Sequence, residues 1–192
     1  MDLNHEFVVN VPIADAWNIL TDLARIAPCL PGAELTEVVD DVYRGHVKVK
    51  VGPILAQFKG QASFLSRDGN AYRATLKAEG RDATGKGNAS ALITAQLTEV
   101  SHTSTTCVVT TDLTISGKVA QFGRGALADV SDKLLAQFSE NLNQLISTGT
   151  SAPATTSEPI NLLQTAGAPI LKRAVPVVIV IAVLVVLISV IF

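Results

Sequence analysis

Histidine and cysteine are the side chains of this chain best suited to bind a metal or act as a nucleophile, so their spacing is the first test for chemistry. His5, His46 and His102 lie far apart, and none has a serine or cysteine partner at the spacing of a catalytic motif. Cys29 and Cys107 form neither a zinc-binding pattern nor a Cys-x-x-Cys redox pair. We therefore expect no metal site, surface or structural histidines, and reduced, buried thiols.

The acidic and glycine-rich segments offer equally weak catalytic patterns. Asp15 and Asp22 are seven residues apart, on one side of a helical segment, and solvation explains such carboxylates better than acid–base work does. Residues 80–87 superficially resemble a phosphate-binding loop, but they lack the Walker spacing. We interpret them as a hairpin between two strands. The chain therefore offers few groups for catalysis.

The residues before Gly32 predict a strand followed by a short helix or helix pair. Apolar and polar side chains alternate, imperfectly, in residues 3–11, and Pro12 ends this strand pattern. The apolar side chains that follow are three or four positions apart and form one stripe: Ile13, Ala16, Trp17, Leu20, Leu23 and Ile26. Pro28 and Pro31 then end the helical pattern.

Period-two alternation after Gly32 predicts an antiparallel sheet with one covered face. It holds through five runs, at residues 43–51, 54–64, 72–78, 85–100 and 104–116. Residues 118–147 return to three- and four-residue spacing, which predicts a long amphipathic helix. We expect an α+β fold of the helix-grip type, with a curved antiparallel sheet wrapped on the long C-terminal helix.

Small residues occupy the predicted inner face of the sheet: Ala56, Gly60, Ala62, Ala74, Ala78, Gly80, Ala89, Ala91 and Ala95. Because protein interiors are close-packed, such a face must either bring the helix very close or leave a cavity. Phe122 and Phe138 on the long helix oppose a close approach. We favour an apolar ligand pocket, and the alternative is that these aromatic side chains simply fill the space.

The C-terminal residues predict a membrane anchor behind a flexible linker. Residues 174–192 carry no charge and, as a helix of roughly 28 Å, approach the thickness of a bilayer. Lys172 and Arg173 precede them and place the globular domain on the cytoplasmic side of the inner membrane. We predict a ligand-binding domain at residues 1–146, a linker at 147–171, and a single-pass transmembrane helix at 172–192.

Charge and the N-terminal residues exclude two other classes. The formal net charge is −2 and no basic cluster is interleaved with aromatic residues, so we expect no nucleic-acid binding. Asp2 and Glu6 stand where a secretory signal would be basic, and no apolar core follows them. We therefore expect no secretory signal.

Motifs in a fixed order along residues 1–146 resemble the CoxG family, which is named for carbon monoxide dehydrogenase. They are Asp15-Ala16-Trp17, Pro28-Cys29-Leu30-Pro31-Gly32, Val47-Lys48-Val49-Lys50-Val51-Gly52-Pro53, Phe58-Lys59-Gly60 and Gly117-Lys118-Val119-Ala120-Gln121-Phe122-Gly123. This family belongs to the SRPBCC, or START-like, superfamily. The resemblance implies a deep hydrophobic cavity between sheet and helix. It also implies work beside a molybdenum-containing CO dehydrogenase, whose electrons must reach quinone in the membrane.

The leading hypothesis is therefore a non-enzymatic carrier that takes quinone, menaquinone or ubiquinone, from the bilayer to CO dehydrogenase. The ligand has no covalent bond to the chain. We expect its apolar cavity to be lined by Trp17, Leu20, Leu23, Ile26, Phe58, Phe64, Tyr72, Leu76, Phe122, Leu127 and Phe138. Tyr72 would donate a hydrogen bond to a quinone carbonyl. Residues 28–32 would form either a mouth of the cavity or a plain connection.

Three other functions fit the same residues. The first is an adaptor or maturation factor that serves CO dehydrogenase at the membrane without carrying a ligand. The second is an enzyme of the polyketide-cyclase type, which needs positioned acid and base groups inside the pocket. The third is lipid transfer without any dehydrogenase, which ligand identity would separate from the carrier.

Overall fold

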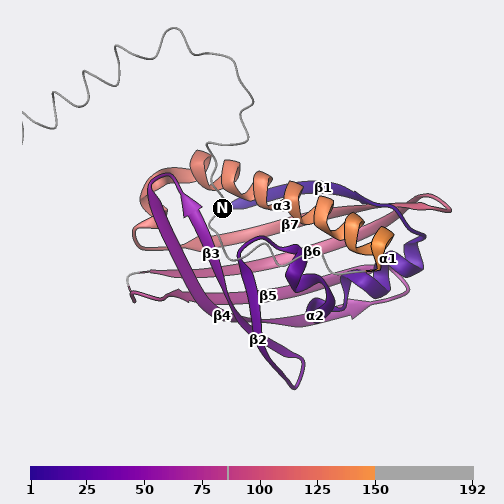
Figure 1. The fold of residues 1–192 in the computed structure, drawn as a ribbon, viewed down its shortest axis with the longest axis horizontal. Helices are drawn as coiled ribbons and strands as arrows, with labels where there is room; N and C mark the ends of the chain where they lie inside the picture. The colour runs from indigo at the N-terminus through magenta and orange to yellow at the C-terminus, as the bar shows by residue number, and fades with distance from the viewer. Residues whose placement is uncertain (86, 150–192) are drawn as a thin grey trace, which may run out of the picture. The chain divides into compact units, whose positions relative to one another are not determined.

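The computed structural model describes residues 1–85 and 87–149, whose course is shown in Figure 1. Its strands are β1 (Asp2–Val9), β2 (Ala33–Val39), β3 (Val42–Val51), β4 (Ile54–Asp68), β5 (Arg73–Asp82), β6 (Asn88–Ser101) and β7 (Ser104–Ile115). Its helices are α1 (Ile13–Leu20), α2 (Leu23–Ile26), α3 (Gly123–Thr148) and the 3-10 turns η1 (Ala27–Cys29) and η2 (Val119–Phe122). The α+β class predicted from the sequence is confirmed.

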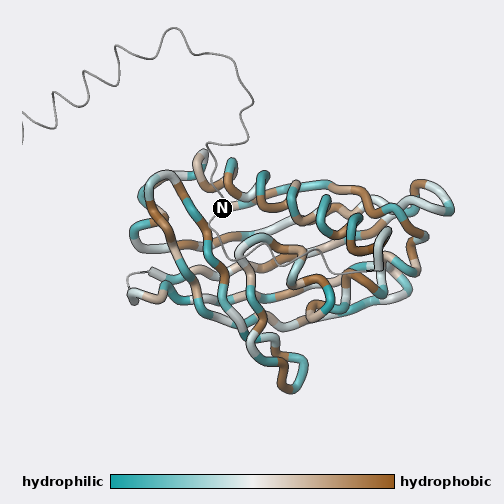
Figure 2. The backbone as a smooth tube through the Cα atoms, viewed as in Figure 1, coloured by the Kyte–Doolittle hydropathy of each residue, from teal (hydrophilic) through white to brown (hydrophobic). Residues whose placement is uncertain are grey.

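The strands form one seven-stranded antiparallel sheet in the order β1-β7-β6-β5-β4-β3-β2. The segment α1–η1 connects the two edge strands β1 and β2, and α3 lies along β1 (Figure 1). Hydropathy alternates along the strands, as expected for a sheet with one covered face (Figure 2). The predicted curved sheet with a long C-terminal helix is therefore present.

The hydrophobic core gathers where β1, α1, η1 and α3 meet. Val9, Ala16 and Leu142 have no exposed surface there. Phe7 and Phe138 meet edge-to-face, with 5.7 Å between ring centroids. This packing fixes α3 against one edge of the sheet and leaves the middle strands to be covered by other means.

Polar side chains hold α3 to the elements beneath it. Asn143 accepts a hydrogen bond from the backbone N–H of Asn10 at 2.9 Å and donates one to the carbonyl of Val8 at 2.8 Å. Asn141 donates to the carbonyl of Cys29 at 3.0 Å. These bonds set the height of α3 above the sheet, because each joins a side chain of the helix to fixed backbone.

Several predicted boundaries are wrong. The strand β2 was not expected, because Glu34, Thr36 and Glu37 interrupt its apolar pattern. The long helix begins at Gly123 rather than at residue 118, since Gly123 has a φ of 76° and separates η2 from α3. The helix then continues to Thr148, two residues into the predicted linker.

The remaining C-terminal predictions fall on residues that the structure does not describe. The linker beyond Gly149 and the membrane anchor at residues 172–192 lie outside the described residues. Within residues 1–85 and 87–149, no helix is both long enough and apolar enough to cross a membrane.

Both cysteines are free and buried, as the sequence predicted. Burial raises the pKa of Cys107 to about 12 and also raises the pKa of Cys29. Because the thiolate is the reactive form, we expect neither cysteine to react with iodoacetamide at pH 8 in the folded protein, and both to react after unfolding in guanidinium. Mass spectrometry of the alkylated chain checks this, and rapid labelling of folded Cys107 would contradict it.

Candidate functional site

An apolar cavity of about 430 Å³ lies against the inner face of the sheet. This volume is within the roughly 300–1,000 Å³ of small-molecule sites. Its wall comes from all of the strands except β1, together with α2, η1 and α3. The residues that line it include Leu23, Ile26, Leu30, Leu35, Tyr43, Val47, Val49, Phe58, Leu76, Ile93, Leu113 and Phe138.

The cavity exists because the middle of the sheet lacks side-chain volume. Gly45, Gly60 and Gly80 pair with one another across β3, β4 and β5, and Ala89 continues their row on β6. The next row but one is again small, and consists of Ala62, Ala78 and Ala91. All seven residues line the cavity. The pocket expected from small inner-face residues is therefore present.

Polar residues of the wall flank the glycine row and face away from it. Glu34, His46, Gln61, Glu79 and Ser90 each neighbour a glycine or Ala89 of that row. Because side chains alternate between the two faces of a strand, these residues present backbone to the cavity and their side chains to the outer face. The wall is therefore predominantly apolar.

The pair formed by His46 and Glu34 follows the same rule. The imidazole Nε2 of His46 lies 3.1 Å from a carboxylate oxygen of Glu34, and the two residues are in register on β3 and β2. Alternation places both side chains on the face opposite Gly45 and Leu35. This ion pair joins the edge strand β2 to the sheet from outside the cavity.

The predicted cavity residues divide into two groups. Leu23, Ile26, Phe58, Leu76 and Phe138 line the cavity, from α2, β4, β5 and α3. Trp17, Leu20, Phe64, Tyr72, Phe122 and Leu127 are not among its lining residues. Trp17 and Leu20 pack against the core instead. Leu127 is buried beneath α3.

Tyr72 is not placed to donate a hydrogen bond into the cavity. Its ring meets that of Trp17 at 6.0 Å between centroids, in an edge-to-face arrangement beside the hydrophobic core. Trp17 in turn lies over Gly69 in the β4–β5 turn. The sequence placed Tyr72 correctly on the inner side, but the contact with Trp17 occupies it.

Two predicted aromatic side chains lie at the ends of the sheet. The guanidinium of Arg67 stacks over the ring of Phe64 at 4.8 Å, after a register shift between Phe64 and Ser66. Phe122 packs near Gly52 in the β3–β4 turn. Neither position follows from helix or strand periodicity, because a bulge and a turn decide it.

Other lining residues were not singled out from the sequence. Tyr43, Val47 and Val49 belong to the apolar set of β3, so strand alternation alone would have found them. Leu35 lies on the unexpected strand β2. Ala27 and Leu30, on either side of the Pro28 turn, also line the cavity. The segment at residues 28–32 therefore borders the cavity.

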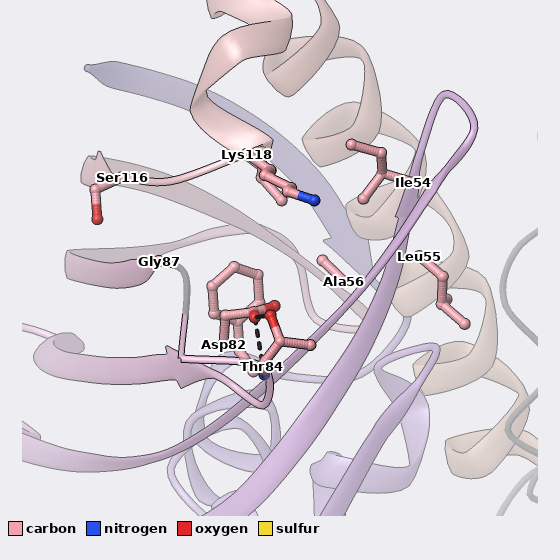
Figure 3. A pocket seen from close by; sticks show the side chains of 10 residues that line it. Ile54, Leu55, Ala56, Asp82, Thr84, Gly87, Ser116 and Lys118 are labelled. Atoms are coloured by element: carbon pink, nitrogen blue, oxygen red, sulfur yellow. Dashed lines mark hydrogen bonds between the residues drawn. The ribbon is translucent and has the colours of Figure 1, made fainter.

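A smaller cavity of about 180 Å³ adjoins the main one, and Phe58 lines both. It lies where the β3–β4 and β5–β6 turns approach the connection from β7 to η2 (Figure 3). Its wall combines the apolar residues Ile54, Leu55, Ala56, Phe58 and Val119 with the polar residues Asp82, Thr84, Ser116 and Lys118. This end of the site is more polar than the main cavity.

Comparisons with known proteins agree with the fold. The model of the carbon monoxide dehydrogenase family CoxG matches residues 6–147. A conserved protein from Geobacillus kaustophilus is 19% identical, with a TM-score of 0.68 over 77% of this chain and 95% of that chain. No curated protein matches the chain.

Two similar solved structures are named for enzymes. The Zhui aromatase/cyclase from Streptomyces sp. R1128 is 14% identical, with a TM-score of 0.54 over 79% of this chain and 99% of that chain. A truncated norcoclaurine synthase from Thalictrum flavum is 15% identical, with a TM-score of 0.54 over 76% of this chain and 92% of that chain. At these identities the likeness shows the shared fold alone.

Proposed function

Because this chain belongs to the carbon monoxide dehydrogenase family CoxG, we propose that it carries respiratory quinone between the membrane and CO dehydrogenase. Family membership associates the chain with the CO dehydrogenase system, and its fold is that of SRPBCC-like proteins. The proposal adds the ligand and its delivery. The chain takes a quinone, menaquinone in the first instance, into the apolar cavity and presents it for reduction.

The observation that carries this proposal is the apolar cavity of about 430 Å³. A quinone tail is driven out of water by about 0.8 kcal/mol for each methylene that it buries. A wall of aliphatic side chains, glycine and alanine can accept such a tail, because it leaves no polar group of the wall unpaired. A soluble enzyme cannot reach a ligand inside the bilayer, so a carrier of this kind would join the two.

The C-terminal sequence supports a membrane-tethered carrier. Residues 174–192 are uncharged and follow Lys172 and Arg173, the pattern of a single-pass anchor with a cytoplasmic domain. A flexible linker of ~20 residues would have a reach of roughly 25 Å. Tethering raises the local concentration of both the membrane ligand and a docked enzyme.

Carriage rather than catalysis is favoured by the chemistry of the wall. Aromatase/cyclases and norcoclaurine synthase share the fold, and a cyclase mechanism needs acid and base groups facing the ligand. Here the ion pair of His46 and Glu34 belongs to the outer face of the sheet. We therefore propose that the chain itself catalyses no reaction.

The test is the identity of the bound ligand. The full chain is expressed in a bacterial host that makes both menaquinone and ubiquinone, purified, and extracted with organic solvent for mass spectrometry. We expect near-stoichiometric quinone, and its type names the ligand. The Ala78→Phe variant, which places a ring in the cavity but keeps the same C-terminal residues, controls for quinone that follows the detergent. Equal quinone in both proteins, or none in either, would favour the adaptor that carries no ligand.

A further inference from the structure

The smaller cavity continues the main one along the same face of the sheet. Ile54, Ala56 and Phe58 alternate on β4, so all three point to the inner side, where Phe58 borders both spaces. Val119 of η2 also lines the smaller space and is buried. The two cavities are thus one site divided by the Phe58 side chain.

The polar groups of the smaller cavity leave one donor for a ligand. The Ser116 hydroxyl is engaged with the backbone of Asn88, from which it accepts a hydrogen bond at 3.0 Å. Asp82 accepts hydrogen bonds from the backbone N–H and the hydroxyl of Thr84. The Lys118 ammonium points toward the middle of the space (Figure 3), and no described residue forms a hydrogen bond or ion pair with it.

The charges around this space select the kind of group that fits. The Lys118 ammonium donates hydrogen bonds, while the Asp82 carboxylate on the same wall repels a second negative charge. A neutral head that accepts hydrogen bonds satisfies both conditions, whereas a phosphate or carboxylate meets repulsion from Asp82. A quinone carbonyl is such an acceptor.

We propose that the smaller cavity holds the neutral, hydrogen-bond-accepting head of an amphiphilic ligand, with Lys118 as its donor and the tail in the main cavity beyond Phe58. This inference rests on the proposed function and adds the orientation of the ligand. The head then lies at the end of the sheet formed by the β3–β4 and β5–β6 turns. That end is where a reducing enzyme would have to dock.

The test compares two ligands that differ in having a head. Menaquinone-4 has a quinone head and an isoprenoid tail, and squalene is an isoprenoid hydrocarbon without a head. Quenching of the single tryptophan, Trp17, follows menaquinone-4 binding to the full chain in detergent, and squalene is measured by competition. Partitioning into micelles is the same for each variant and cancels in their ratio.

We expect Lys118→Met to weaken menaquinone-4 about fivefold, which corresponds to one partly solvated hydrogen bond from a charged donor. Competition by squalene should not change, and Lys118→Arg should restore most of the loss. Lys59→Met is the matched control, because Lys59 is an exposed neighbour of Phe58 that lines neither cavity. Circular dichroism confirms that each variant is folded.

The outcomes separate this inference from the function on which it rests. Unchanged menaquinone-4 affinity in Lys118→Met would overturn the head site and leave the carrier intact. Equal weakening of menaquinone-4 and squalene would also overturn it, because the effect would not concern the head. If neither ligand binds the unmodified chain, both the carrier and the head site fail.

Discussion

Replacing Gly60 by alanine is expected to lower the free energy of unfolding by about 3 kcal/mol, at the upper end of overpacking effects. A Cβ atom on Gly60 would overlap the carbonyl oxygen of Glu79 and would lie 2.6 Å from the Cα of Gly80. Both obstacles are backbone atoms of β5, so no side-chain rotation relieves them. The strands β4 and β5 would have to separate at the centre of the sheet.

Gly80→Ala is the matched control for this prediction. Gly80 is the register partner of Gly60, and a Cβ there would have ordinary contacts, at 3.4 Å from Cβ of Phe58 and 3.6 Å from the carbonyl oxygen of Lys59. Since glycine inside a strand costs roughly 0.5–1 kcal/mol relative to alanine, we expect Gly80→Ala to be neutral or slightly stabilising. Guanidinium unfolding followed by Trp17 fluorescence compares the two variants. Similar losses in both would refute the steric explanation.

The contrast between these glycines explains how the sheet makes room for a ligand. At Gly60 the strands approach so closely that a side chain has no space, and close strands let the sheet curve. At Gly80 the space above the strand belongs to the cavity. The same row therefore supplies both curvature and volume, which a row of larger residues would not do.

Strand alternation was enough to predict most of the sheet and the small inner face. The runs that became β3 to β7 have apolar residues on every second position, and the alanines at 62, 78 and 91 face the cavity as expected. β2 escaped prediction because an edge strand needs only one partner, and its segment carries Glu34 and Glu37. Sequence patterns that reflect burial are weak where burial is slight.

The cavity wall was predicted less well than the fold, for local reasons. Phe58, Leu76 and Phe138 follow from periodicity alone and line the cavity. Tyr72 and Trp17 do not, because their mutual contact in the core depends on how α1 meets the β4–β5 turn. Lys118 was seen only as part of a motif, since its approach to Asp82 requires segments that are distant in the sequence.

Ala78→Phe is expected to weaken quinone binding by at least about tenfold, a change of about 1.4 kcal/mol in binding free energy. Ala78 lines the cavity and lies in register between Ala62 and Ala91, which line it too. A phenyl ring at this position occupies space that the ligand needs. Because that space is empty in the folded chain, we expect the free energy of unfolding to change by less than about 1 kcal/mol, unlike insertion into a packed core.

Lys77→Phe adds the same ring to the opposite face of β5 and is the matched control. The Lys77 side chain is 49% exposed and pairs with Glu79 at 2.6 Å, and such surface pairs contribute little to stability. Titration with menaquinone-4 should therefore show unchanged affinity in Lys77→Phe. Loss of binding in both variants would mean that the added ring acts through the sheet rather than by filling the cavity.

The same variant separates the carrier from the adaptor. In membranes that contain CO dehydrogenase, a carrier with a filled cavity should still bring the enzyme to the membrane, because the outer surface is unchanged. CO-dependent reduction of membrane quinone should nevertheless fall with the loss of quinone affinity. An adaptor that carries no ligand predicts normal quinone reduction in Ala78→Phe, since its cavity takes no part in electron transfer. Measuring recruitment and quinone reduction on the same membranes therefore decides whether the empty space under α3 is used.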